Sequence, residues 1–210
     1  MDTDLKKTLA SDLFGEALSK SQTTQIRIVE GAIKCFVKFG VDKASYQRIA
    51  KAAGCSYALA KHYYPDRDLL FEATARYIRI RFQRLAIEAL ESQTTPTEQL
   101  KSYVTSTFQW VRLFPAHAQV WMLFFFMCGT QKSYRALNTE VVNMGHARIM
   151  ALLRQGKKQD GFIYDNEASA AKSVQLAITG AVVTLITEDT DDLESLRRDV
   201  LRLCLTVVGK

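Results

Sequence analysis

The sequence contains few of the residues that interrupt helices, bind metals or form disulfides. Its 210 residues include three prolines and ten glycines, and alternating apolar and polar runs bounded by turn residues are scarce, which argues against a β-sheet. Its four cysteines form no Cys-x-x-Cys pair, and its histidines do not stand at metal-ligand spacing. We therefore expect an all-α protein with reduced thiols and with no metal site or cofactor.

Long apolar runs are also missing. The most apolar one, Val120–Cys128, has about half the length that a membrane-spanning helix needs. Residues 1–18 lack the uninterrupted apolar core of a secretory signal peptide. These two absences predict a soluble, cytoplasmic protein.

Positive charge is concentrated in one short segment. Residues 22–67 carry eight lysines and arginines against three acidic residues, a net charge of +5, whereas residues 1–21 carry −1 and residues 68–210 carry +2. A basic block on a nearly neutral remainder is typical of a module that binds phosphates. Charge alone would equally fit a protein that binds RNA or a membrane surface.

Apolar residues recur with a helical period along most of the chain. Gly40 stands where it can end a helix, while Asp66 and the Thr95–Pro96 pair stand where they can begin one. The pattern predicts helices at residues 4–18, 23–39, 45–52, 56–64, 67–91, 96–113, 116–128, 132–156, 165–187 and 192–208. We expect three parts: an extension at 1–21, a DNA-binding domain at 22–66 and a larger helical domain at 67–210.

The segment from Ser45 to Arg67 predicts a helix-turn-helix. Ser45 and Ser56 can each cap a short helix, and the turn between the two helices contains Gly54, which reaches positive φ without steric cost. Two short helices joined by such a turn have the spacing of a DNA-binding motif whose second helix enters the major groove. The second helix must end before Pro65.

This segment resembles the tetracycline-repressor (TetR) family of regulators. The resemblance covers about 45 residues closely and the later helices in number and order only. It rests on Ile26, Ala32, Phe36, Gly40, Ser45, Ile49-Ala50, Ala53-Gly54-Cys55-Ser56, Tyr63-Tyr64-Pro65 and Arg67-Asp68-Leu69-Leu70. The chain departs from the family at Ala60-Lys61, where Leu-Tyr is usual, and at Tyr46, where a small β-branched residue is common. Operator preference therefore cannot be transferred from a relative.

The resemblance implies two sets of DNA-binding residues in this chain. Gln47, Tyr57 and Ala58 are implied to face base edges, and Gln47 has the donor and the acceptor that adenine recognition requires. The residues implied to contact phosphates are Ser45, Tyr46, Lys61, Tyr63 and Arg67. The alternative is that these lysines and tyrosines form only a solvated face and a packing rim.

The resemblance also implies a homodimer formed by the last two helices, at about 165–187 and 192–208. A single recognition helix reads few base pairs, and a dimer on a palindromic site solves this problem. Residues 174–185 are nearly all apolar or small, and Gly180 would allow two helices to approach closely. Burial of these faces within one protomer would explain the same pattern.

The middle of the larger domain is the expected sensor. Aromatic and methionine residues are concentrated between Trp110 and Met127, and such an interior can hold a small apolar ligand. The candidate ligand-binding residues are Tyr103, Gln109, Trp110, His117, Trp121, Phe124, Phe125 and His146. The resemblance implies a repressor that a ligand releases from DNA, and we expect the ligand to act by moving the long helix at 67–91. Aromatic residues at helical spacing are otherwise ordinary core.

Two other functions are alternatives to a ligand-controlled repressor. An enzyme is disfavoured, because no local nucleophile–base signature and no phosphate-binding glycine-rich loop are present. A DNA-binding protein that responds to a protein partner, with no small-molecule effector, would share the helix-turn-helix and lack the pocket.

Overall fold

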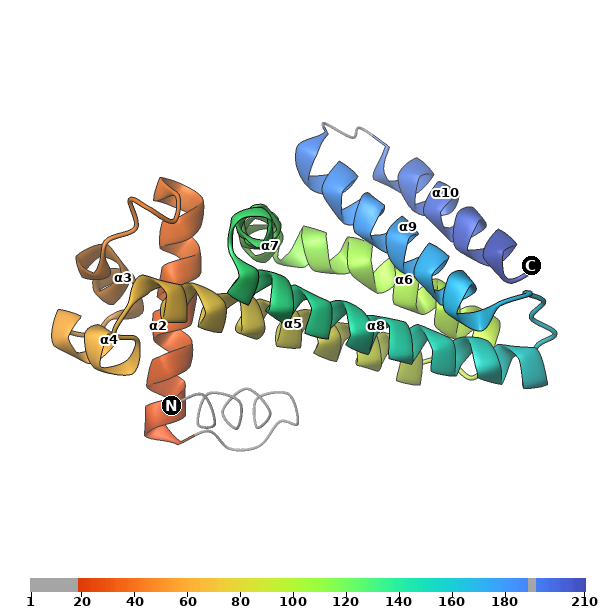
Figure 1. The fold of residues 1–210 in the computed structure, drawn as a ribbon, viewed down its shortest axis with the longest axis horizontal. Helices are drawn as coiled ribbons and strands as arrows, with labels where there is room; N and C mark the ends of the chain where they lie inside the picture. The colour runs from red at the N-terminus through yellow and green to blue at the C-terminus, as the bar shows by residue number, and fades with distance from the viewer. Residues whose placement is uncertain (1–18, 189–191) are drawn as a thin grey trace. The chain divides into compact units, whose positions relative to one another are not determined.

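The computed structural model describes residues 19–188 and 192–210, and within them it contains nine α-helices and no β-strand. Figure 1 labels the helices in chain order. They are α2 (Lys20–Phe39), α3 (Tyr46–Ala53), α4 (Tyr57–Tyr63), α5 (Arg67–Glu91), α6 (Pro96–Leu113), α7 (Pro115–Thr130), α8 (Lys132–Gln159), α9 (Glu167–Thr187) and α10 (Leu193–Val207). The all-α prediction is confirmed, and the helix predicted at 4–18 lies outside the described residues.

Local capping determines where several of these helices begin. Ser45 and Ser56 accept hydrogen bonds from the backbone N–H groups of Arg48 and Leu59, at 3.4 and 3.1 Å. Asp66 accepts from the Leu69 N–H at 2.7 Å, and Thr95 caps α6 immediately before Pro96. Each of these bonds satisfies a donor that the helix itself leaves without a partner.

The described residues form two compact units. The first contains residues 19–81 and 119–125, and the second contains residues 82–118, 126–188 and 192–210. The change from one unit to the other therefore falls within α5, after Arg81. The sequence predicts a domain boundary between residues 66 and 67. That boundary concerns independent folding, and it stays a prediction.

In the first unit, α2 packs closely against α3, and α3 packs against α4 (Figure 1). Ile28, Phe36 and Ile49 are almost completely buried. Gly31 permits the approach of α3, because a Cβ atom there would lie 2.9 Å from the Ile49 carbonyl oxygen and 3.0 Å from the Ala53 nitrogen. The packing of α2 against α3 thus fixes the position of the first helix of the helix-turn-helix.

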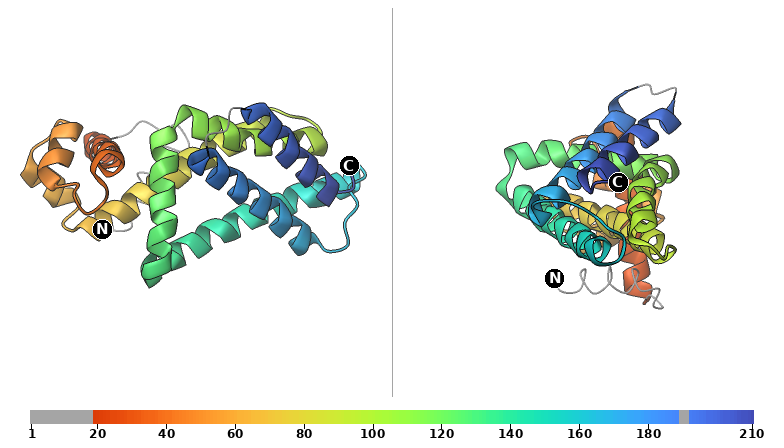
Figure 2. Two further views of the ribbon diagram at one scale, coloured as in Figure 1. Left: turned by 90° about the horizontal axis from the view of Figure 1, so that it is seen from above. Right: turned by 90° about the vertical axis from the view of Figure 1, so that its right-hand side faces the viewer.

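In the second unit, α9 contacts α6, α8 and α10, and Figure 2 shows these helices from two further directions. Their shared core includes Val104, Leu153, Val174 and Cys204, all completely buried. By length and composition α9 could cross a membrane, but a helix packed in this way in a protein core passes the same test.

Packing explains where α8 ends and which face of α7 is covered. α8 continues through Gly156 to Gln159, because the missing side chain at Gly156 makes room for the buried ring of Phe162. α7 is apolar along nearly its whole length, yet Phe126 is 70% exposed. Its neighbour Phe124 is completely buried, so α7 has one covered and one open face.

Candidate nucleic-acid interface

Hydrogen bonds from α2 anchor the turn between α3 and α4. Gly54 ends α3 in the left-handed region, with φ of 63°. The Arg27 guanidinium donates to the carbonyl oxygens of Ala53 at 2.6 Å and Gly54 at 2.8 Å. The turn therefore has both the glycine that its backbone requires and a fixed anchor on the supporting helix.

Tyr46 is a structural tie between α3 and the start of α5. Tyr46 is 8% exposed, and its hydroxyl shares its one hydrogen between the carbonyl oxygens of Tyr64 and Asp66, each 2.7 Å away. Burial raises the pKa of Tyr46 to about 12, and the nearby Asp66 adds to the effect. This hydroxyl is therefore engaged inside the protein, and a contact of Tyr46 with a phosphate stays a prediction.

We expect Tyr46→Phe to lower the free energy of unfolding by about 1–3 kcal/mol, because two largely buried carbonyl oxygens lose the one hydroxyl donor that they share. Urea unfolding followed by circular dichroism measures this change. Tyr57→Phe, which removes a hydroxyl from an exposed ring, is the matched control and should change stability little. Equal effects of the two substitutions would show that the Tyr46 hydroxyl has no structural role.

The three residues predicted to face bases all lie on the exposed surface of the motif. Gln47 is exposed on the first turn of α3, and Tyr57 and Ala58 are exposed on the first turn of α4. The Tyr57 ring, 48% exposed, lies edge-on to the Tyr46 ring with centroids 6.3 Å apart. The first turn of α3 therefore presents an amide to solvent, and the first turn of α4 presents an aromatic ring and a small residue.

The other predicted phosphate contacts are half-buried and already bonded within the chain. Lys61 donates to the Pro65 carbonyl oxygen at 2.7 Å and lies 4.4 Å from the Tyr46 ring centroid. Arg67 donates to the Asp42 carbonyl oxygen at 2.5 Å. The Tyr63 hydroxyl shares a 3.1 Å hydrogen bond with Ser21. These internal hydrogen bonds stabilise the motif, and contacts of the three residues with phosphates stay a prediction.

Exposed lysine and arginine side chains near the motif contribute to the positive charge of the segment, and the sequence alone implies no specific role for them. Lys43, Arg48 and Lys51 are exposed before and along α3, and His62 is exposed on α4. Arg48 donates to the Lys43 carbonyl oxygen at 2.9 Å and lies 4.3 Å from the Phe39 ring centroid. Their positive charge is evident from the sequence, but which of these side chains are exposed depends on how α3 packs.

The predicted ligand-binding residues do not form a single group. Tyr103 and Trp110 are buried on α6, whereas Gln109 is exposed and lines a cavity of about 390 Å³ between α6, α9 and α10. Trp121 lies 4.8 Å from Phe124 and 5.7 Å from Phe125, measured between ring centroids. These three aromatic residues belong to the first unit.

The two predicted histidines are separate from that aromatic cluster. His117 stacks on the Phe114 ring with centroids 5.2 Å apart, and His146 is half-buried on α8. In the described part of the chain, no group of three or more His, Cys, Asp or Glu residues is arranged to hold a metal ion.

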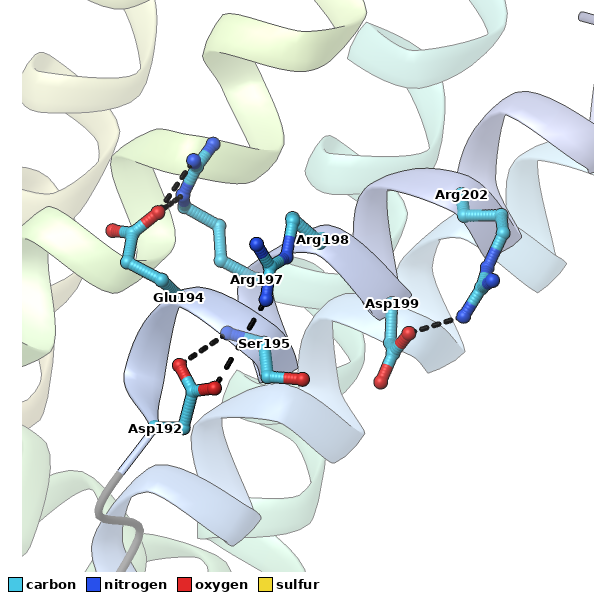
Figure 3. A network of polar contacts seen from close by, with 7 residues as sticks. All are labelled: Asp192, Glu194, Ser195, Arg197, Arg198, Asp199 and Arg202. Carbon is cyan, nitrogen blue, oxygen red and sulfur yellow. Dashed lines mark hydrogen bonds and ion pairs between the residues drawn. The ribbon is translucent and has the colours of Figure 1, made fainter.

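The outer surface of α9 and α10 combines apolar residues with paired charges. Leu176 on α9 is 62% exposed and Leu203 on α10 is 53% exposed. Gly180 lies four residues after Leu176, and a Cβ atom there would meet no atom within 4 Å. Figure 3 shows acid–arginine pairs along α10: Asp192 with Arg198, Glu194 with Arg197, and Asp199 with Arg202.

The basic segment matches a known protein family. Residues 28–74 match the model of bacterial regulatory proteins, tetR family. An HTH-type transcriptional repressor of Mycobacterium tuberculosis is 42% identical over 50 residues, which are 24% of this chain and 27% of the relative. The chain covers between 27% and 62% of the length of the first three curated relatives, so the similarity does not extend over whole proteins.

Solved structures share the fold over most of the chain. A TetR transcription regulator from Haloarcula marismortui has a TM-score of 0.77 at 16% identity, covering 89% of this chain and 96% of that one. A Saccharomonospora viridis protein solved in complex with choline has a TM-score of 0.72 at 22% identity, covering 84% and 92%. At these identities the likeness concerns the fold alone.

Proposed function

Residues 28–74 place this chain in the TetR family of bacterial regulatory proteins, and on that premise we propose that it is a transcriptional repressor. It binds a palindromic DNA operator as a homodimer in the cytoplasm, and a small molecule releases it. The observation that carries this proposal is the exposed first turn of α4 beside Gln47, in a segment rich in exposed cations. The chain acts by binding and not as an enzyme.

The exposed surface of the motif is suited to a DNA major groove. The groove is wide enough to admit one α-helix, and its base edges present both donors and acceptors. Gln47 can bond to adenine through both the oxygen and the nitrogen of its side-chain amide, while Tyr57 and Ala58 can make apolar contacts with thymine methyl groups. Lys43, Arg48 and Lys51 supply the charge for neighbouring phosphates, which adds affinity without specifying sequence.

A dimer through α9 and α10 would present two such motifs to two half-sites. The exposed leucines at 176 and 203, and the open surface at Gly180, support this surface as the contact. A symmetric interface needs a self-complementary patch, and α10 carries both signs of charge along its length. We propose a four-helix contact made by two helices from each protomer.

A small-molecule effector is proposed for the second unit. The buried aromatic residues of α6, Tyr103 and Trp110, provide the apolar surroundings that ligand sites use. A structural relative of this fold was solved with choline bound, which supports a small molecule as the class of effector. The effector acts only if it binds the DNA-free arrangement more tightly than the DNA-bound one.

The proposal is tested by selecting bound fragments from genomic DNA and measuring binding to the enriched site. We expect a short inverted repeat. Gln47→Ala should weaken binding to this site by about 1–3 kcal/mol while leaving binding to random DNA unchanged, because the lost contact reads a base. Fluorescence anisotropy at several salt concentrations measures both affinities.

Gln159→Ala, at an exposed glutamine on the last turn of α8, is the matched control and should bind both DNAs as the parent does. The proposal is wrong if no sequence is enriched, since the basic segment is then only a nonspecific anchor. It is also wrong if Gln47→Ala weakens random and selected DNA equally.

A further inference from the structure

One buried face of α6 carries three polar side chains in a row. Tyr103, Thr107 and Trp110 follow one another at helical spacing and are 4%, 1% and 3% exposed. Within the described ranges, the Thr107 Oγ1 and the Trp110 Nε1 atoms have no hydrogen-bond partner. Buried polar groups in proteins are nearly always bonded, so two unbonded ones on adjacent turns of one helix require an explanation.

Burying the Thr107 hydroxyl and the Trp110 indole N–H without partners lowers the stability of the folded protein. Valine and phenylalanine would fill similar volumes without placing a donor in an apolar interior. Ser106, which is also buried on α6, bonds to the Tyr103 carbonyl oxygen at 2.7 Å. The helix therefore satisfies one buried hydroxyl locally and leaves the Thr107 hydroxyl and the Trp110 indole N–H available.

A cation from α8 lies at the same face. Burial raises the pKa of Tyr103, and the nearby Arg148 guanidinium counteracts that rise. Arg148 is half-buried, and none of the ion pairs found among residues 19–188 and 192–210 includes it. Its positive charge therefore has a tyrosine hydroxyl nearby and, among the described residues, forms no ion pair with a carboxylate.

The surroundings of the donors are apolar. The Phe82 ring lies 5.2 Å from the Trp110 ring, measured between centroids. Val104, on the turn between Tyr103 and Thr107, is completely buried. A molecule that meets these residues would need an apolar body and a group that accepts hydrogen bonds.

We propose that the effector is a small carboxylic acid whose carboxylate is bound by Arg148, Thr107 and Trp110 and whose apolar body contacts Phe82. This inference rests on the proposed function, because the acid is taken to be the effector of the regulator. A carboxylate accepts hydrogen bonds only and pairs with a guanidinium in matching geometry, and its two oxygens have enough lone pairs for all three donors. A quaternary ammonium ligand such as choline would instead meet a like charge and donors that it cannot satisfy.

The test uses the full chain and a set of matched probes. Butyrate, octanoate and benzoate are compared by calorimetry with their alcohol and trimethylammonium analogues. We expect at least one acid to bind about tenfold or more tightly than its analogues, because a bond to a charged group is stronger than a neutral one. Operator release is measured with the same probes.

Thr107→Val distinguishes a ligand contact from a packing defect. We expect it to raise the melting temperature of the ligand-free protein, since an unbonded hydroxyl is removed, and to weaken binding of the acid by about tenfold. Thr105→Val, on a different face of α6 beside the 390 Å³ cavity, is the matched control and should leave acid binding unchanged.

The proposal is overturned if none of the three acids binds, if the alcohols or ammonium compounds bind as tightly, or if Thr107→Val leaves acid binding unchanged. Operator binding is measured without any probe, so the proposed function is judged separately. Loss of sequence-specific DNA binding with intact acid binding would reject the regulator and keep the carboxylate site.

Discussion

Gly180→Glu is expected to convert the protein to monomers and to lower its affinity for the operator by about a thousandfold or more. Gly180 is exposed on α9, and a Cβ atom there would meet no atom of its own chain within 4 Å. The substitution should therefore leave the protomer folded and act only where a second protomer approaches. A carboxylate at the centre of a helix contact would be buried without a partner, which opposes association strongly.

The large effect on DNA follows from the loss of the second half-site. A monomer carries one recognition helix and retains mainly the phosphate contacts, whose affinity resembles nonspecific binding. Light scattering after size-exclusion chromatography measures the mass, and fluorescence anisotropy measures operator affinity. Gly129→Glu, at another glycine whose Cβ position is open, is the matched control and should stay dimeric. A Gly180→Glu protein that remained dimeric would place the interface elsewhere.

Gly31→Val is expected to abolish operator binding by forcing α2 and α3 apart. The new Cβ atom would lie 2.9 Å from the Ile49 carbonyl oxygen and 3.0 Å from the Ala53 nitrogen, and both are backbone atoms of a packed helix. Neither can move without displacing α3, so relief by side-chain rotation is not available. Overpacking of this kind costs about 3 kcal/mol, more than replacement of a helical glycine gains.

The expected result has two parts. Urea unfolding should show a less stable first unit, while the α6–α8–α9–α10 core, far from Gly31 in sequence, keeps its helical signal. Operator binding should fall to the nonspecific level, because α3 holds Gln47 and positions the turn to α4. Gly129→Val serves as the control for valine at a glycine with open surroundings. Unchanged operator binding by Gly31→Val would show that the two helices can separate without cost to function.

Helix positions were predictable wherever the signals are local. The prediction for α5 at 67–91 matches the observed bounds, because Asp66 caps the helix from the adjacent position. The start of α6 follows in the same way from Thr95 and Pro96. α8 was predicted to end at Gly156, and it continues because Phe162 occupies the space beside that glycine, which no local signal reveals.

The candidate DNA-binding residues were predictable as a segment and less so one by one. Gln47 and Tyr57 are both exposed, as contacts with base edges require. Tyr46 could not be placed from the sequence, because its hydroxyl bonds to Tyr64 and Asp66, which follow much later in the chain. Long-range contacts of this kind decide whether a tyrosine faces solvent or the interior.

The candidate effector residues were the hardest to predict. Tyr103 and Trp110 share a face of α6 that the helical period indicates, and Gln109 lies on a different face by the same period. Thr107 and Arg148 were not singled out. Whether the Thr107 hydroxyl has a hydrogen-bond partner depends on all the residues that pack around it, which the sequence does not reveal. Arg148 comes from a different helix, α8.

The tie made by Tyr46 and Arg27 bears on how such a regulator can acquire a new target during evolution. The bonds that hold the motif together run through these two residues and backbone carbonyl groups, behind the exposed surface. Gln47 and Ala58 contribute none of those bonds, so a gene duplicate could change both residues and recognise another operator without a compensating change in the frame. Divergence between duplicated copies would then concentrate at these exposed positions while Tyr46 and Arg27 stay the same.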